Sequence, residues 1–177
     1  MKKLLTLALA LLAFAACDDD DDDALRFAQE NTKIENGQLT GSNMHFLGTS
    51  TATAADGTTF TDDKALFEFA GSIQELALYM QGTRFAAAMP ALKMRLYDVP
   101  YTGRGNSIAF SLDEIVPGVY LPNEVGGGYS YQPLPAYTLT QVSGSIDGIE
   151  CRVAFSCDVP RLGAYRVEYV GKLLENY

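Results

Sequence analysis

Few side chains in this sequence are of types suited to catalysis. The chain holds a single histidine, His45, and three cysteines, Cys17, Cys151 and Cys157. His45 lies in an alternating segment that predicts a strand, and alternation turns it away from its two apolar neighbours toward solvent. A hydrolytic triad needs three such groups to converge, and the chain has no GxSxG nucleophile elbow.

The other polar candidates predict turns and exposed surface. Asp113 and Glu114 are adjacent, so an extended chain points them to opposite faces. Glycosidases instead need two carboxylates facing each other across about 5–10 Å. Arg104 stands between Gly103 and Gly105 without a following Walker pattern, which favours a turn over a phosphate-binding loop. We therefore expect no enzymatic activity and no cofactor.

The first 16 residues have the pattern of a secretion signal. Lys2 and Lys3 precede an apolar run over residues 4–16, which is 13 residues long. That run makes roughly 20 Å of helix, whereas a membrane-spanning helix needs about 20 apolar residues. A charged start, a short apolar core and small residues at the end are typical of a secretion signal.

The end of this segment, Phe14-Ala15-Ala16-Cys17, resembles the lipobox of bacterial lipoproteins, with Phe14 at the place where Leu is usual. The resemblance implies cleavage before Cys17 and attachment of lipid, such as palmitate, to that cysteine. More than one acyl chain is needed for stable anchoring, and mature lipoproteins usually carry two or three. The alternatives are an ordinary cleaved signal with a chance cysteine, or an uncleaved anchor.

Six consecutive aspartates follow the cysteine at residues 18–23. Like charges repel and stay solvated, so the run predicts at least an extended spacer. Asp18, Asp19 and Asp20 directly after Cys17 also resemble the export signal of surface lipoproteins of Bacteroidetes. That resemblance implies attachment to the outer membrane and display at the cell surface, with a periplasm-facing orientation as the alternative. The run lacks the turn and spaced ligands of a calcium loop, so no metal is expected.

Composition narrows the choice of partners. Removal of residues 1–16 takes both early lysines and leaves 11 basic against 22 acidic side chains, a formal charge of −11. Nucleic-acid binding needs a basic face, so it is not expected. About 140 residues remain after the tether, which is enough for one domain with its own core. We expect a signal peptide at residues 1–16, a lipidated cysteine and acidic tether at 17–37, and a β-domain at 38–177.

The domain reads as a series of short strands. Alternating or β-rich segments occur about every 8–12 residues, with Asp147-Gly148 as a strong hairpin signal. Residues 84–89 suggest a short helical turn. The pattern predicts an all-β fold, an antiparallel barrel of about eight strands, with a β-sandwich as the alternative. The expected strands lie at residues 39–54, 60–69, 76–80, 92–97, 108–112, 137–146, 149–157 and 165–170.

Cys151 and Cys157 fall in one of these strands. Six residues of extended chain separate them by roughly 20 Å, too far for a disulfide, which needs Cα atoms within about 7 Å. They share one face with Val153 and Phe155, so both are expected to be small core residues.

Three segments carry a resemblance to a family. RFAAAMP at 84–90, PAYTLT at 135–140 and YRVEY at 165–169 resemble lipoproteins of Bacteroidetes with a calycin-like, lipocalin-like β-barrel domain. The similarity spans about residues 39–174 and is one of pattern and order. It implies a barrel fold, and it gives no functional residues.

The best place for binding is an irregular insertion expected at residues 113–136, which contains four prolines and three consecutive glycines. Tyr120, Tyr129, Tyr131 and Tyr137 lie in or beside it, and tyrosine suits both stacking on sugars and packing against proteins. The alternative is that these rings cap the open end of the barrel. We expect a non-catalytic envelope lipoprotein that binds a small molecule, a glycan or an envelope protein. The rival is a structural or assembly component with a filled barrel.

Overall fold

A computed structural model of the protein describes residues 33–40, 43–71 and 74–174. The expected signal peptide, the lipidation residue Cys17 and the export residues Asp18, Asp19 and Asp20 lie outside these segments. Within them, no helix is long and apolar enough to cross a membrane.

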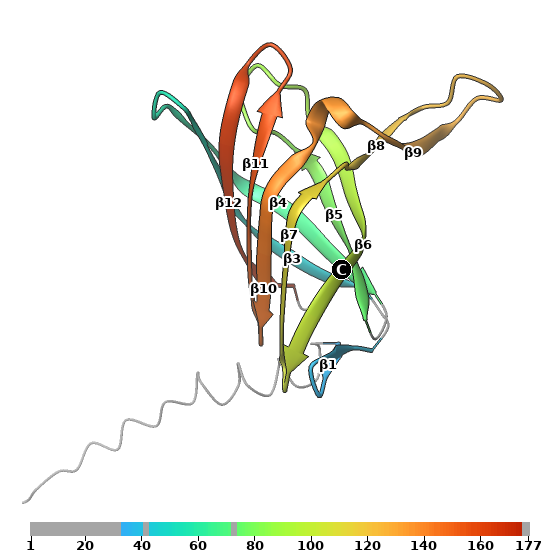
Figure 1. Ribbon diagram of the computed structural model, residues 1–177, viewed down its shortest axis with the longest axis vertical. Helices are drawn as coiled ribbons and strands as arrows, with labels where there is room; N and C mark the ends of the chain where they lie inside the picture. Colours follow the sequence, from blue (N-terminus) through green and yellow to red (C-terminus); the bar gives the residue numbers. More distant parts are fainter. Residues whose placement is uncertain (1–32, 41–42, 72–73, 175–177) are drawn as a thin grey trace, which may run out of the picture.

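The described chain is almost entirely β-structure (Figure 1). A single turn of 3-10 helix, η1 (Pro135–Tyr137), accompanies the strands in these segments. The strands are β1 (Ile34–Glu35), β2 (Gln38–Leu39), β3 (Met44–Ala54), β4 (Thr59–Gly71), β5 (Glu75–Thr83), β6 (Leu92–Arg104), β7 (Ser107–Ile115), β8 (Gly118–Pro122), β9 (Tyr129–Pro133), β10 (Leu139–Asp147), β11 (Glu150–Val159) and β12 (Gly163–Leu173).

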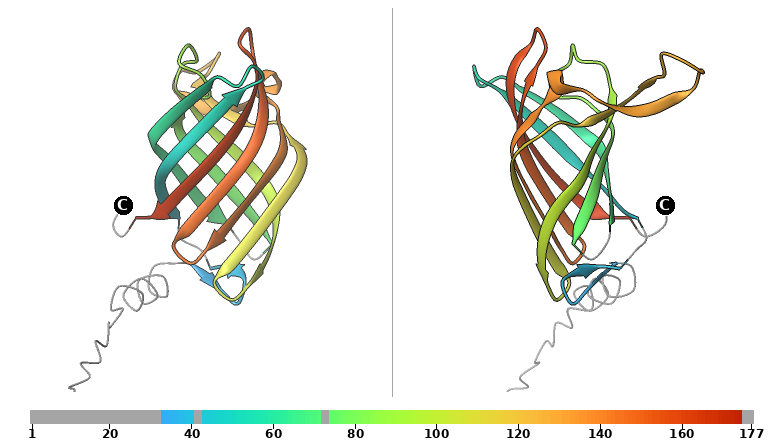
Figure 2. Two further views of the ribbon diagram at one scale, coloured as in Figure 1. Left: turned by 90° about the vertical axis from the view of Figure 1, so that its left-hand side faces the viewer. Right: turned by 45° about the vertical axis from the view of Figure 1, so that its right-hand side comes forward.

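Eight antiparallel strands close into a barrel in the order β3-β4-β5-β6-β7-β10-β11-β12. Each pairs with its neighbour along this list, and β12 returns to β3 from Tyr165↔Ala54 to Leu173↔Phe46. The tilted strands of the closed wall are visible in Figure 2. The expected all-β barrel is confirmed, and closure of the sheet excludes the sandwich.

Large side chains fill the interior of the barrel. Phe69 on β4 lies 6.2 Å from Phe110 on β7, a contact that crosses the barrel between strands that are not neighbours. Phe85, in the β5–β6 connection, lies 5.3 Å from Phe155 on β11. Buried methionine and leucine side chains from β3, β5 and β6 pack beside these rings. The interior is therefore a packed core, as small eight-stranded barrels permit.

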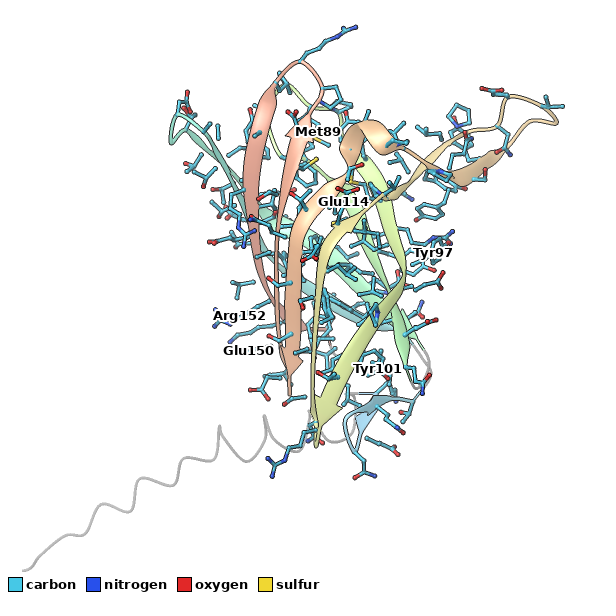
Figure 3. All side chains as sticks on the ribbon, in the orientation of Figure 1. Met89, Tyr97, Tyr101, Glu114, Glu150 and Arg152 are labelled. Atoms are coloured by element: carbon cyan, nitrogen blue, oxygen red, sulfur yellow. The ribbon has the colours of Figure 1, made fainter. Side chains whose placement is uncertain are left out.

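Both ends of the barrel are covered. At one end the β5–β6 connection, residues 84–91, buries Phe85 and Met89. Its backbone forms bends and a turn, and not the short helical turn that was expected. Met89 is labelled at this end in Figure 3. At the other end the β1–β2 hairpin buries Ile34 and Leu39.

The β1–β2 hairpin docks through a close glycine contact. A Cβ on Gly37, whose φ is +75°, would lie 2.2 Å from the carbonyl carbon of Gly103. The backbone N–H of Gly37 donates to the carbonyl of Gly105 at 2.7 Å, and that of Leu39 donates to the Tyr101 hydroxyl at 2.9 Å. Residues 34–37, which the sequence placed in the tether, thus form part of the covered end of the barrel.

The expected irregular insertion is a regular hairpin. Strand β7 continues through Asp113 and Glu114 to Ile115, and β8 and β9 then form a ribbon that projects from the barrel (Figures 1 and 2). The ribbon joins the wall through two residue pairs of β8 with β6, Met94↔Val119 and Arg95↔Gly118. The prediction of irregular chain was wrong for residues 113–115, 118–122 and 129–133. Pro122 and Pro133 lie at the ends of edge strands, where no ladder hydrogen bond is lost, and Pro117 and Pro135 lie outside the strands.

Candidate binding site

Two barrel strands carry polar aromatic side chains to the outside, at the root of the projecting hairpin. On β5 and β6 the residues Leu78, Met80, Met94 and Leu96 are fully buried inside. Alternation therefore turns Tyr79, Arg95 and Tyr97 outward. Tyr79 pairs directly with Arg95 across the two strands, and the Tyr79 and Tyr97 rings lie 6.3 Å apart, edge to face. Figure 3 shows Tyr97 on the outer side of the wall.

The hairpin brings a third ring to the same place. Arg95 pairs with Gly118 at the start of β8, and Gly118 pairs with Pro133 on β9. A Cβ on Gly118 would lie 3.4 Å from the Cβ of Tyr131, so this glycine lets the Tyr131 side chain lie close over the backbone. The Tyr131 ring then lies 6.0 Å from that of Tyr79.

Arg95 lies among these three rings. Its guanidinium carbon is 2.9 Å from the ring centre of Tyr97, 4.3 Å from that of Tyr131 and 5.6 Å from that of Tyr79. A guanidinium within about 6 Å of an aromatic face is attracted by the ring quadrupole. We call Arg95, Tyr79, Tyr97 and Tyr131 the arginine cage.

Two polar atoms of the cage are buried without a hydrogen-bond partner, the Nε of Arg95 and the hydroxyl of Tyr97. Among the described residues, Arg95 also has no carboxylate within ion-pair distance. The neighbouring Glu68 instead lies 3.5 Å from His45 and accepts from Asn43 and Gln81. Burial raises the pKa of Tyr131, and the positive charge of Arg95 opposes that rise. Arg95 is therefore a cation among aromatic rings that forms no ion pair with a carboxylate of the described residues.

Tyr120 and Tyr129 extend this surface along the hairpin. Their rings stack 5.6 Å apart with an angle of 22° between planes, and the Lys93 ammonium lies 5.8 Å from the Tyr120 ring. Tyr129 is 61% exposed and Val125, at the tip, is 88% exposed. We call Tyr120 and Tyr129 the tyrosine platform. It is an exposed aromatic step beside the cage.

The hairpin tip is organised by one side chain. Asn123 Nδ2 donates to the carbonyl of Gly127 at 3.0 Å, and the hydroxyl of Ser130 donates to Asn123 Oδ1 at 2.5 Å. The three glycines all have positive φ, between +70° and +84°, which non-glycine residues rarely adopt. The glycine run that suggested an irregular loop is therefore the turn of a hairpin.

Three of the four predicted binding tyrosines come together, and the fourth does not. Tyr120, Tyr129 and Tyr131 share the hairpin, whereas Tyr137 lies in η1, half-buried against the core. Its carbonyl is 3.8 Å from Cys157 Sγ. Sequence reasoning did not single out Tyr79, Arg95 and Tyr97. Their outward alternation was visible, but the strand register that gathers them was not.

The other candidate residues form no centre. Asp113 and Glu114 are both exposed on β7, and no group of three His, Cys, Asp or Glu residues with metal-binding geometry occurs in the described segments. Cys151 and Cys157 are free and buried on the inner face of β11, as expected. Depressions on the barrel include four that are lined by none of Tyr120, Tyr129 and Tyr131, and one of these is lined by Tyr97 together with Glu75 and Asp98.

Comparison with known proteins adds no assignment to this geometry: no protein-family model matches the chain, and no curated protein matches it. A barrel of this shape hosts many functions. The arginine cage and the tyrosine platform are therefore the features of this chain that bear on its function.

Proposed function

We propose that the protein is a non-catalytic lipoprotein of the cell envelope that binds a partner molecule on the outside of its barrel, through the arginine cage and the tyrosine platform. The carrying observation is Arg95, a half-buried cation with an unpartnered Nε and no acid at ion-pair distance among the described residues. Burying a polar group without a partner costs free energy. A bound partner that pairs with the guanidinium would offset part of this cost.

The packed core supports an external site over an internal one. Small-molecule sites are concave spaces of about 300–1,000 Å³ that enclose most of the ligand. In this barrel the corresponding space holds the rings of Phe69, Phe110, Phe85 and Phe155. Both ends are also covered, by residues 84–91 and by the β1–β2 hairpin. We therefore propose a ligand on the outside of the barrel and not inside it.

The projecting hairpin supports binding more directly. Tyr120, Tyr129 and Val125 are exposed on one ribbon that stands away from the wall. Aromatic residues and arginine are enriched at the energetic centres of interfaces. The short apolar N-terminus, Cys17 and the aspartates after it support a lipid anchor that would display this ribbon on the outer membrane.

A structural or assembly role is the second candidate, and the filled barrel favours it equally. In that role the same cage and platform would contact another envelope protein permanently. The binding role and the assembly role use the same surface. They differ in whether the bound partner can dissociate and be replaced.

The test is site-specific photo-crosslinking in the source bacterium with the full lipidated chain. A photoreactive phenylalanine analogue replaces Tyr129 on the platform, and a control carries it at Val170, an exposed residue of β12 on the barrel wall. We expect a defined adduct from position 129 and none from position 170. Equal labelling at both positions, or none at 129, would remove the proposed surface. An adduct whose yield is unchanged when the solubilised complex is moved into fresh detergent before irradiation would favour the assembly role.

A further inference from the structure

The arginine cage has the composition of a site for one negative charge. A guanidinium whose face is covered by rings keeps its N–H groups along its edge, and this fork matches a carboxylate in a two-bond geometry. The guanidinium carbon of Arg95 lies over the rings of Tyr97 and Tyr131, 2.9 Å and 4.3 Å from their centres. The Nε of Arg95 and the Tyr97 hydroxyl are buried, so the terminal nitrogens of the guanidinium are the donors that a ligand would meet.

The charge around the cage does not suit a polyanion. Lys93 and Arg95 are the cations beside the rings, and Glu68 is close enough to raise the pKa of Tyr131. Glu75 and Asp98 line a depression together with Tyr97, so the surface has no excess of positive charge, on a chain whose net charge is −9. Nucleic acids and polyphosphates are bound by neutralising several charges together, which this surface does not provide.

The tyrosine platform beside the arginine cage indicates which class of ligand would carry the carboxylate. Tyr120 and Tyr129 are 41% and 61% exposed, with their rings stacked on each other, and the hairpin around them bears the neutral polar side chains of Asn123, Ser130 and Gln132. A protein ligand would be held by side chains buried in pockets, whereas Tyr120 and Tyr129 are exposed on a ribbon that projects from the wall. A sugar ring needs only an aromatic face and hydrogen-bonding neighbours.

From this juxtaposition we propose that the surface binds an acidic saccharide, with the carboxylate of a uronic or sialic acid on the terminal guanidinium nitrogens of Arg95 and a sugar ring on Tyr120 and Tyr129. The proposal rests on the proposed function and names its ligand class. Arg95 is the residue that selects the acid, and the two platform tyrosines supply contact that is independent of charge.

The test uses the full lipidated chain in detergent micelles on an array of uronate- and sialate-bearing oligosaccharides. Each oligosaccharide is printed beside its own methyl ester, which keeps the ring and removes the charge. We expect acidic forms to bind and esters to bind about 10- to 100-fold more weakly, the range of a charge-assisted hydrogen-bond pair. Equal binding of acid and ester, or binding of neither, overturns the proposal.

Matched variants separate the two parts of the site. Arg95→Gln should bring the acid down to the level of its ester, whereas Tyr129→Ala should weaken both forms by a similar factor. Arg152→Gln is the control, because Arg152 is an exposed arginine on β11, on the wall. Thermal unfolding of each variant checks the fold. If Arg95→Gln binds the acids as tightly as the parent does, the assignment of Arg95 is wrong.

Two further arms distinguish other sources of the carboxylate. Acetate at millimolar concentration should not displace a bound saccharide, since it lacks the ring. A peptide ending in glutamate should not bind, and tight binding of it with loss in Arg95→Gln would replace the saccharide by an acidic peptide. If the array is negative while Tyr129 still crosslinks in cells, the saccharide proposal fails and the proposed function stands.

Discussion

The guanidinium carbon of Arg95 lies 4.3 Å from the centre of the Tyr131 ring, so a cation on the barrel wall meets an aromatic face on the projecting hairpin. The backbone connection at this place is short, two residue pairs between β6 and β8. A cation–π contact contributes about 0.5–2 kcal/mol, depending on its desolvation. This side-chain contact therefore contributes to the orientation of the hairpin, together with the buried Val119 and the contact of Tyr131 with Tyr79.

Replacing Tyr131 with alanine should loosen the hairpin without unfolding the barrel. The change removes the ring that covers Arg95, while the core strands keep their contacts. Hydrogen exchange over residues 118–133 should accelerate, and exchange in β11 and β12 should not change. Tyr131→Phe keeps the ring and serves as the matched control, with exchange close to that of the parent. Faster exchange in both variants would assign the effect to the hydroxyl instead.

Inside the barrel, the tyrosine Tyr169 makes both a hydrogen bond and a ring contact. The Tyr169 hydroxyl donates to the carbonyl of Phe46 at 2.7 Å, and its ring stacks on Phe67 at 3.8 Å. Tyr169→Phe keeps the stack and leaves the carbonyl short of a partner, so the free energy of unfolding should fall by about 1–3 kcal/mol. Tyr165→Phe, a partly exposed tyrosine of the same strand, should change it by less than about 0.5 kcal/mol. Equal urea midpoints for the two variants would contradict this.

The wall of the barrel could be predicted from the sequence because its evidence is local. Alternation over residues 76–80 and 92–97 identified the inward side chains, and Asp147-Gly148 identified a hairpin, which the structure confirms between β10 and β11. The Gly148 φ of +56° is the conformation that such a turn requires. Period and turn chemistry act over a few residues, so one sequence suffices to detect them.

The cage could not be predicted because it depends on register. Arg95 acquires its environment from its pairing with Tyr79 on one side and with Gly118 on the other. Both pairings join residues far apart in the chain, and a shift of one residue would turn every side chain to the other face. The hairpin was missed for a different reason. Pro122 and Pro133 read as strand breakers, but they lie at the ends of edge strands.

Anchoring rests on Cys17, which can be tested directly. Cys17→Ser should abolish incorporation of labelled palmitate and release the protein from membranes, because a serine hydroxyl does not replace the thiol in the lipid transfer. The variant Cys151→Ser is the control and should label like the parent. Continued labelling and membrane partition of Cys17→Ser would exclude the lipoprotein assignment.

Display at the surface rests on the acidic run. Replacing Asp18, Asp19 and Asp20 with alanine should keep palmitate labelling and reduce digestion by protease added to whole cells. Replacing three exposed acidic residues elsewhere, Asp63, Asp113 and Glu114, with alanine controls for a general effect on export. Equal digestion of the aspartate variant and the parent would show that the run is only a spacer.

The two thiols of β11 should be shielded in the folded protein. Cys151 is fully buried and Cys157 is 2% exposed, and neither is bridged. A thiol reagent should react with neither until the chain is denatured, and then with both without prior reduction. Cys151→Ala should cost about 1–2 kcal/mol, and Cys151→Ser more, because a buried hydroxyl without a partner is costly. A requirement for reductant would mean that the two cysteines are bridged in solution.

Stability should also decline above pH 9 because of these thiols. Burial, and then the charge of Asp158, raises the pKa of Cys157 to about 12, and burial raises that of Cys151 as well. An unfolded thiol has a pKa of about 8.5, so below that pH both states keep their protons and the stability is complete. As pH rises toward 12 only the unfolded chain loses protons from these thiols, and the free energy of unfolding falls by up to about 1.4 kcal/mol per pH unit for each thiol.

Urea unfolding between pH 7 and 10.5 measures this slope. The double variant Cys151→Ala, Cys157→Ala should flatten it relative to the parent, since tyrosine ionisation is common to both proteins. Parallel slopes would show that the thiols ionise alike in both states, and therefore that β11 does not bury them in solution.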